Sequence, residues 1–156
     1  MKKKILSLLL VMSVLVISGC GKTPQIDQLD KDVYHYSNTL LGLNVDLPKE
    51  FVDYQVQVIP GRNEQKEIIT DWRDLEILVP TADLSFERIG GAYVRPVTIR
   101  VFEAGKYQDS AGFEKIYEGK GKAYAIKFWD KWPKDWQDKW NDKLAESIKK
   151  SFKVIE

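Results

Sequence analysis

The chain has 156 residues but only one cysteine and one histidine. A disulfide framework needs at least two cysteines, and a zinc site needs several nitrogen or sulfur ligands, so neither is expected. The G-x-S-x-G and phosphate-loop motifs are also missing from the sequence. We therefore predict a protein that has no metal or cofactor and is not an enzyme. A hydrolase built on two carboxylates, which need only lie about 5–10 Å apart, stays open as a third alternative.

The sequence also lacks a marked excess of charge of one sign. Lys and Arg number 24 against 23 Asp and Glu, and no block of basic residues follows the N-terminal lysines. Nucleic-acid binding normally shows as a basic domain or stripe, so we do not expect it. A content of 44% hydrophobic and 30% charged residues is typical of a globular protein, and the length allows one domain.

The N-terminal residues have the features of a bacterial secretion signal. Three lysines precede an apolar run over residues 5–17, which is shorter than the ~20 residues that span a bilayer. The run ends in Ile17-Ser18-Gly19-Cys20, which resembles the lipobox of bacterial lipoproteins. The resemblance implies cleavage between Gly19 and Cys20 and a lipid anchor, palmitate included, on Cys20.

The secretion signal and the lipobox-like motif predict three segments of the chain and its location in the cell. Residues 1–19 are expected to be the signal peptide, residues 20–32 the lipidated cysteine with a flexible tether, and residues 33–156 a single domain. The lipid anchor would hold the protein outside the cytoplasm, on the outer face of the cytoplasmic membrane or, in a Gram-negative cell, on the outer membrane. Loss of the three lysines leaves 21 basic and 23 acidic residues, a net charge of −2.

Alternation of apolar and polar residues predicts several β-strands. Residues 33–36 and 43–47 flank turn residues and predict a hairpin that ends at Pro48, and residues 97–102 form the clearest single strand. Further strands are expected at four places, with an exposed loop over residues 62–66. These strands cover residues 54–58, 67–70, 75–79 and 122–129.

Helical spacing predicts two helices. A short one begins at Ser110, because Phe113, Ile116 and Tyr117 lie at i, i+3 and i+4, and it ends at Gly119. A long C-terminal helix is predicted from Pro133, because apolar residues recur every four positions at Trp136, Trp140, Leu144 and Ile148. Residues 151–155 are expected to return as an edge strand. The predicted fold class is therefore α/β (α+β), an antiparallel sheet of about six strands covered by helices.

Both ends of the domain carry motifs of a known family. Tyr36-x-Asn38 followed by Gly42-Leu43-x-Val45-x-Leu47-Pro48-x-x-Phe51, together with Ser151-Phe152-Lys153, resembles the PsbP-like family. The resemblance covers about forty residues and implies an antiparallel sheet with helices on both faces, used for binding or assembly without catalysis. Position 43 is Leu and position 51 is Phe where the family more often has Phe and Trp, and no functional residue carries over.

Four of the five tryptophans form a cluster, which is the candidate ligand or partner surface. They are Trp129, Trp132, Trp136 and Trp140. Coplanar, exposed indoles can stack on sugar rings, whereas the helical spacing of Trp136 and Trp140 equally fits burial against the sheet. Trp132 is the member that depends least on the core stripe.

The first functional hypothesis is a membrane-anchored binding or accessory module for another envelope component, expected to be a protein. The alternative is a binder of cell-wall glycan or a small ligand that uses the tryptophan cluster. The small hydrolase is the third.

Overall fold

The computed structural model describes residues 26–30 and 33–155 of the chain. The expected signal peptide and Cys20 lie outside the described residues. The described part consists mainly of β-strands, with one α-helix, α1 (Asp142–Ser151), and two short 3-10 helices, η1 (Lys49–Phe51) and η2 (Lys134–Trp136). The strands are β1 (Ile26–Asp30), β2 (Val33–Asn38), β3 (Leu43–Pro48), β4 (Gln55–Arg62), β5 (Ile68–Pro80), β6 (Tyr93–Glu103), β7 (Glu114–Gly119), β8 (Lys122–Phe128) and β9 (Lys153–Val154).

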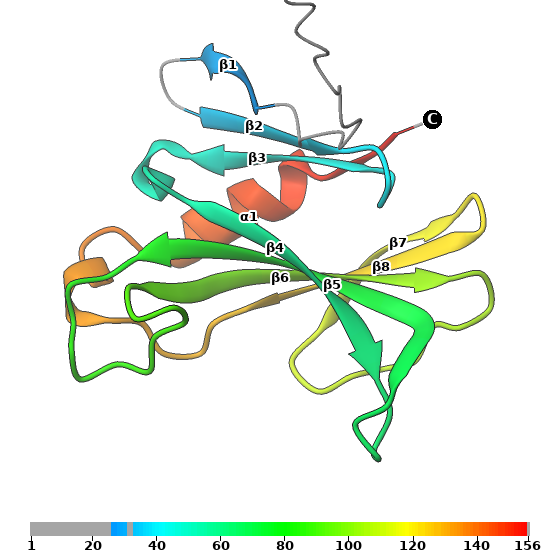
Figure 1. The fold of residues 1–156 in the computed structure, drawn as a ribbon. Coiled ribbons are helices and arrows are strands. Elements are labelled where there is room, and N and C mark those ends of the chain that lie inside the picture. The colour runs from blue at the N-terminus through cyan, green and yellow to red at the C-terminus, as the bar shows by residue number, and fades with distance from the viewer. Residues whose placement is uncertain (1–25, 31–32, 156) are drawn as a thin grey trace, which may run out of the picture.

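The strands form two antiparallel sheets that face each other (Figure 1). The four-stranded sheet has the order β1-β2-β3-β9, and the five-stranded sheet has the order β4-β5-β6-β8-β7. The first and last described strands, β1 and β9, both belong to the four-stranded sheet. The outer face of the five-stranded sheet therefore lies on the side of the molecule away from both ends of the described chain.

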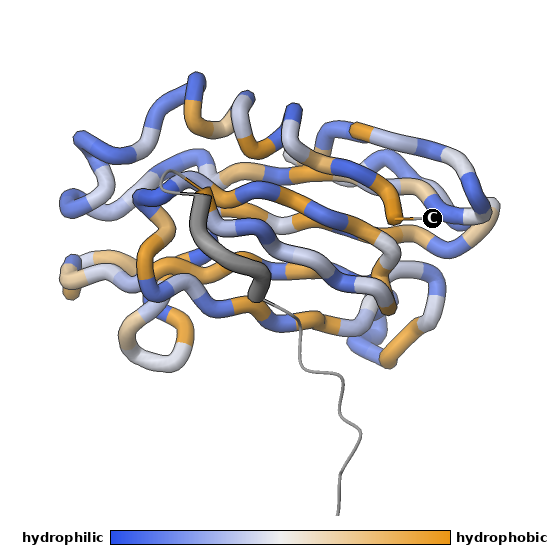
Figure 2. The backbone as a smooth tube through the Cα atoms, turned by 90° about the horizontal axis from the view of Figure 1, so that it is seen from above, coloured by the Kyte–Doolittle hydropathy of each residue, from blue (hydrophilic) through white to orange (hydrophobic). Residues whose placement is uncertain are grey.

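The hydrophobic core fills the space between the two sheets. Hydrophobic and hydrophilic residues alternate along the strands, as the tube in Figure 2 shows, and this alternation points every second side chain into the core. From the four-stranded sheet the core receives Leu43, Val45 and Leu47, which are fully buried. From the five-stranded sheet it receives Ile99 and Ile126 among others. α1 runs beside β3 and adds Leu144 and Ile148 to the same core.

The predicted fold class is wrong. The structure has two antiparallel sheets and one α-helix of ten residues in its described part, instead of one sheet covered by helices. The family resemblance implied helices on both faces of a sheet, and the structure contradicts this as well. The local motifs at the two ends are real strands and turns: the hairpin of β2 and β3 is confirmed, and β9 pairs with β3. Such motifs fix local geometry only, so they do not determine what packs on the rest of the sheet.

The prediction of one long C-terminal helix is also wrong, although the apolar residues of that segment are buried as expected. Trp136 is 1% exposed and Ile148 is 0% exposed, but η2 and α1 are separate. Asn141 has an extended backbone and its side chain accepts a hydrogen bond from the Leu144 N–H, so it caps the start of a new helix. The Asn-Asp pair at 141 and 142 is the capping signal that the four-residue periodicity concealed.

The short helix predicted after Ser110 is a loop followed by strand β7. The pairing of β7 with β8 shifts register between Lys115 and Tyr117. Such a bulge lets Ile116 and Tyr117 both pack against the core. Two adjacent inward residues produce the spacing that we read as helical.

Two predicted strands, residues 67–70 and 75–79, are parts of the single strand β5, which has 13 residues. The polar stretch between them, including Asp74, stays in the sheet because β4 and β6 pair with β5 on both sides. Part of the segment expected as a tether forms β1, which pairs with β2. Among the described residues no helix has the length and apolar character needed to cross a membrane.

Candidate functional site

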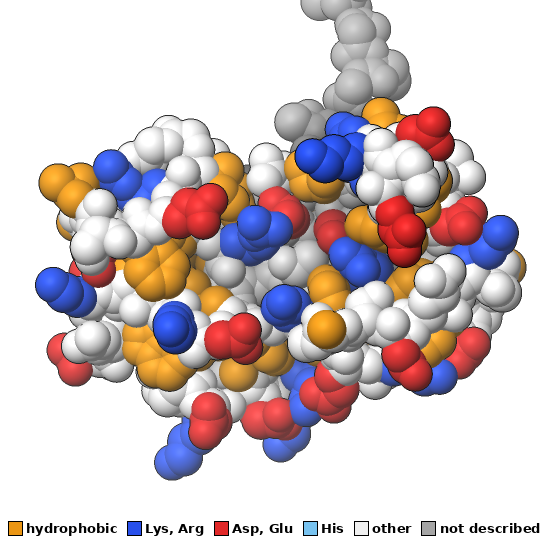
Figure 3. Space-filling view, turned by 90° about the horizontal axis from the view of Figure 1, so that it is seen from below, with side chains coloured by type: hydrophobic (Ala, Val, Ile, Leu, Met, Phe, Trp, Pro, Cys, Tyr) orange, Lys and Arg blue, Asp and Glu red, His pale blue; other side chains and the backbone are white. Residues whose placement is uncertain are grey.

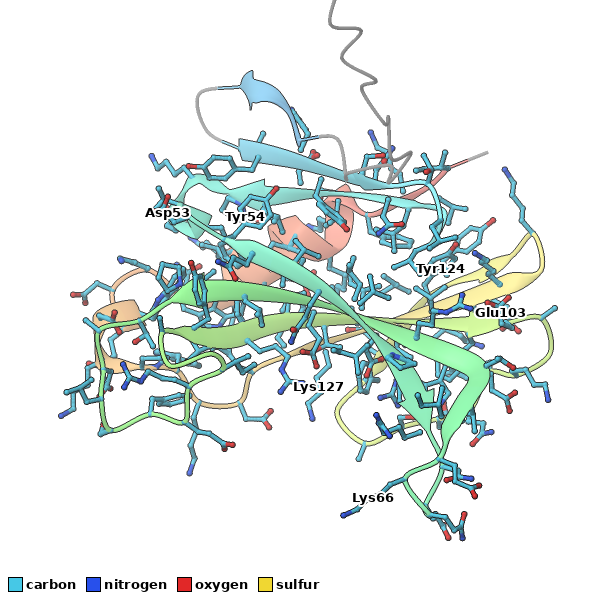
Figure 4. The ribbon with its side chains drawn as sticks, in the orientation of Figure 1. Asp53, Tyr54, Lys66, Glu103, Tyr124 and Lys127 are labelled. Atoms are coloured by element: carbon cyan, nitrogen blue, oxygen red, sulfur yellow. The ribbon has the colours of Figure 1, made fainter. Side chains whose placement is uncertain are left out.

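The outer face of the five-stranded sheet carries rows of polar side chains that face away from the core. Leu75 and Ile77 of β5 point into the core, so Asp74 and Glu76 lie on the opposite side. Figure 3 looks onto this outer face and shows Lys and Arg side chains around a hollow near its middle. Figure 4 shows Lys127 on this side of the sheet, whereas Tyr124 of the same strand points toward the other sheet.

One row crosses four strands at the same level. Gln57 pairs with Glu76, Glu76 with Thr98, and Thr98 with Lys127 in the registers of β4, β5, β6 and β8. Directly opposite residues in antiparallel strands have Cβ atoms about 4.5–5.5 Å apart, so neighbours in the row contact each other. The Gln57 amide donates a hydrogen bond of 2.6 Å to Glu76 Oε2, and Arg95 of β6 pairs with the other oxygen of the same carboxylate.

The neighbouring row on the same face, in which Asp74 of β5 lies opposite Arg100 of β6, contains a nearly buried ion pair. Arg100 Nε donates to Asp74 Oδ1 at 2.8 Å and Arg100 Nη2 donates to Asp74 Oδ2 at 2.9 Å, which makes the pair bidentate. The Arg100 guanidinium carbon lies 3.7 Å from the centroid of the Trp72 ring and 4.4 Å from that of Phe113. Its Nη1 also donates to Ser110 Oγ at 3.2 Å. The guanidinium is therefore held between two rings and fixed in its plane.

The loop that joins β6 to β7 forms one wall of the hollow. Tyr107 and Phe113 of this loop pack on Phe102 and the small residues of β8, which makes a second, smaller apolar cluster outside the main core. Gly112 has a φ of +78° and a Cβ on it would lie 3.0 Å from Lys127 Cε. Glycine at this position therefore allows both the turn and the close passage of the Lys127 side chain.

These features line a half-open cavity of about 340 Å³. The lining residues are Asp74, Arg95, Thr98, Arg100, Phe113, Lys127, Phe128 and Trp129. A volume of this size lies at the lower end of the range of small-ligand sites, about 300–1,000 Å³. The lining combines three cationic side chains, one carboxylate, one hydroxyl and three aromatic rings, so it offers both polar and apolar contacts.

The charges around the cavity do not cancel. Asp74 neutralises Arg100, and Glu76, beside the cavity, neutralises Arg95. Lys127 has no carboxylate partner among the described residues, and its ammonium lies 5.9 Å from the centroid of the Phe113 ring. The cavity thus carries about one net positive charge, located at Lys127.

The tryptophan cluster does not form an open platform. Trp136 and Trp140 are buried, and the indole of Trp129 stands almost perpendicular to both, at interplanar angles of 72° and 80°. Trp136 Nε1 donates to the Pro80 carbonyl at 3.0 Å, which fixes it in the core. Trp132 is 37% exposed and is the one member of the cluster with a large accessible surface.

The loop over residues 81–89 is held against η2 by two carboxylates. Asp135 accepts hydrogen bonds from the Thr81 hydroxyl and the Ala82 N–H, and Asp83 accepts one from the Lys134 N–H. Hydrogen bonds from the Ser85 hydroxyl and from backbone N–H groups lower the pKa of Asp83 to about 2. Partial burial raises the pKa of Asp135, but its two hydrogen bonds outweigh this and the pKa lies below its ordinary value.

A second depression lies on α1 and carries less chemistry. It is lined by Asp142, Lys143, Glu146, Ser147 and Lys150. Ser147 and Lys150 have the spacing of a serine–lysine pair, but the Ser147 hydroxyl donates to the Leu144 carbonyl of its own helix at 2.8 Å. The site is therefore assigned to the cavity on the five-stranded sheet.

Sequence reasoning missed this cavity, because its residues come from three strands and a loop that are distant in the sequence. The signal was present in part: Arg100 and Lys127 each lie on the polar side of an alternating strand. Their meeting depends on the strand order β5-β6-β8, which alternation cannot give. Comparisons of this chain with protein-family models, with curated proteins and with solved structures give no match.

Proposed function

We propose that this protein is a lipoprotein anchored outside the cytoplasm through Cys20, and that its β domain is a non-catalytic binding module. The observation that carries the binding role is the cavity on the outer face of the five-stranded sheet, whose lining offers cations, a hydroxyl and aromatic rings together. The lipobox-like residues before Cys20 support the anchor.

The position of the cavity suits an anchored protein. Cys20 precedes Ile26, the first residue of β1, by six positions, so the connecting residues reach at most about 20 Å. β1 lies in the four-stranded sheet, and the cavity lies on the far side of the other sheet. Anchoring would therefore keep the four-stranded sheet near the lipid and leave the cavity accessible to an envelope component.

A binding role also fits the state of the acidic groups in the site better than catalysis does. Asp74 is held by two hydrogen bonds from Arg100, and Glu76 by Gln57 and Arg95. A carboxylate that serves as a general base or nucleophile must be free to take a proton or attack, and both groups here would first have to break an ion pair. These pairs position the cavity walls instead.

Site-specific photocrosslinking in cells tests the proposal. Ala111 is exposed at the rim of the cavity, between Ser110 and Gly112, and a photoreactive residue there removes no existing interaction. Leu40, which is 74% exposed on the turn between β2 and β3, is the matched control. The proposal expects a discrete adduct from position 111 and none from position 40. Equal labelling at both positions, or none at either, would refute it.

The anchor is tested separately by feeding cells an alkyne fatty acid. The wild-type chain should take up the label, and the Cys20→Ala variant should not. Label retained in the variant would place the lipid elsewhere and contradict the assignment of Cys20.

A further inference from the structure

We infer that the cavity on the outer face of the five-stranded sheet binds a small organic anion, with a carboxylate or phosphate group seated between Lys127 and Thr98. The inference rests on the proposed binding function and names its ligand class. It is carried by the groups of the cavity that have no partner in the described protein.

Lys127 is the first of these groups. Its ammonium carries three N–H donors, and no described carboxylate pairs with it. The Lys127 side chain passes close to Gly112 in the loop wall, and Lys127 lines the cavity. An anion is the ligand that cancels the remaining positive charge.

Thr98 is the second group. It is only 7% exposed, yet its hydroxyl makes no hydrogen bond within the described part of the chain. It lies directly opposite Lys127 in the register of β6 and β8. The Thr98 oxygen is not among the fully buried unpaired atoms of the described residues, so it is accessible from the cavity that the residue lines. A ligand oxygen in the cavity could accept its hydrogen bond. The hydroxyl and the ammonium therefore point to one oxyanion.

The two arginines supply further donors. A guanidinium has five N–H groups, and Arg100 uses three of them on Asp74 and Ser110. Arg95 uses one on Glu76 and its side chain is 44% exposed. Each arginine thus keeps its charge balanced by a protein carboxylate while N–H groups remain for a second acceptor.

The aromatic lining determines what is attached to the anionic group. Phe113, Phe128 and Trp129 line the same cavity, and a ligand with an apolar or ring-shaped body would cover them. Inorganic phosphate would leave these surfaces in water. We therefore expect an organic anion to bind more tightly than the inorganic ion, since each apolar surface removed from water adds to the affinity.

Calorimetric titration of the purified full-length lipidated chain in detergent tests the inference. The probes are phenyl phosphate, benzoate, inorganic phosphate and the uncharged benzyl alcohol. We expect saturable binding of phenyl phosphate or benzoate at a ratio of one to one, weaker binding of inorganic phosphate, and no binding of benzyl alcohol. The affinity should fall as the salt concentration rises.

Three variants locate the site. Lys127→Gln removes the unpaired charge and should weaken binding of the aromatic anion about tenfold or more, because a charge-assisted hydrogen bond is lost. Thr98→Val keeps the β-branched shape without the hydroxyl, and should weaken binding several-fold. Lys153→Gln makes the same charge change on β9 of the other sheet and should leave the affinity unchanged.

Each outcome bears on the inference. Absence of binding by all probes at millimolar concentration overturns it, as does equal affinity of the Lys127→Gln and wild-type chains. If Lys127→Gln does not fold, as judged by its thermal unfolding, the Thr98→Val variant carries the test. Equal affinities for inorganic phosphate and phenyl phosphate would overturn the inference that the ligand carries an apolar or ring-shaped body. A crosslink at position 111 without anion binding would leave the proposed function standing and refute only the ligand class.

Discussion

The ion pair of Asp74 and Arg100 gives the sharpest test of how the site is built. We predict that Asp74→Asn lowers the free energy of unfolding by about 3 kcal/mol. Removing one partner of a buried pair costs about 3–5 kcal/mol, because the other charge stays buried without compensation. The side chains here are 12% and 15% exposed, and Arg100 keeps its contacts with Trp72 and Ser110, so the lower end applies.

A double-mutant cycle isolates the pair itself. Arg100→Met should also cost about 3 kcal/mol, whereas the double variant should cost clearly less than the sum, by about 2 kcal/mol, because no unpaired charge remains. Urea unfolding followed by tryptophan fluorescence measures all four chains, with the denaturant slope checked for constancy. Trp72 stacks on the guanidinium, so it also reports on the site locally.

An exposed ion pair on the same sheet provides the control. Arg73 and Glu103 lie 3.4 Å apart with side chains 37% and 42% exposed, so Glu103→Gln should cost at most ~1 kcal/mol. Asp74 and Arg100 do not form a stabilising buried pair if Asp74→Asn costs no more than Glu103→Gln, or if the two single effects in the cycle add within about 0.5 kcal/mol.

Three further predictions concern the tryptophan cluster, the cap of α1 and the loop over residues 81–89. Trp136→Ala should cost about 3–5 kcal/mol in urea unfolding, because the indole is 1% exposed, whereas Trp132→Ala should cost less than ~1 kcal/mol; similar costs would place Trp132 in the core. Asn141→Ala should cost about 1 kcal/mol by loss of the cap on Leu144 and Asn141→Ser much less, and equal costs would argue against a cap. Asp83 has a folded pKa of about 2, below the ~3.9 of an unfolded aspartate, so its contribution is present above about pH 4 and is lost as the pH falls through 2. Fluorescence-monitored stability should therefore drop less between pH 4 and pH 2 in Asp83→Asn than in the wild type, and parallel curves would contradict this.

Local patterns in the sequence were enough to predict the strands that are determined by residues close together in the chain. The hairpin of β2 and β3 is predicted because Leu43, Val45 and Leu47 alternate strictly and Pro48 ends the run. The same rule places Val97, Ile99 and Val101 on one side of β6. In both cases the residues that determine the strand lie within a few positions of each other.

The errors arise where neighbours in space decide the structure. A bulge in β7 imitates helical spacing at Ile116 and Tyr117, and the Asn141 cap divides a stripe that reads as one helix. The polar middle of β5 remains in the sheet because partners on both sides pair with it, and Arg100 neutralises Asp74. A prediction that considers one segment of the sequence at a time cannot take these distant partners into account.

The candidate site could be predicted only in part from the sequence. Thr98, Arg100 and Lys127 are each recognisable from the sequence as the polar side of a strand. Their common face follows only from the pairing of β6 with β8 and from the loop that carries Gly112. The sequence therefore contains the groups of the site without the arrangement that makes them a site.

One measurement tests the cavity as the binding site most directly, because it combines crosslinking at the rim with removal of the Lys127 charge. Cells carry the photoreactive residue at position 111, with either the native Lys127 or Lys127→Gln, and the adducts are compared after irradiation. We predict a discrete adduct with the native lysine and a clear loss of it in the variant, with equal amounts of protein in the membrane. An adduct of undiminished yield in the variant would contradict the assignment of this cavity as the binding site.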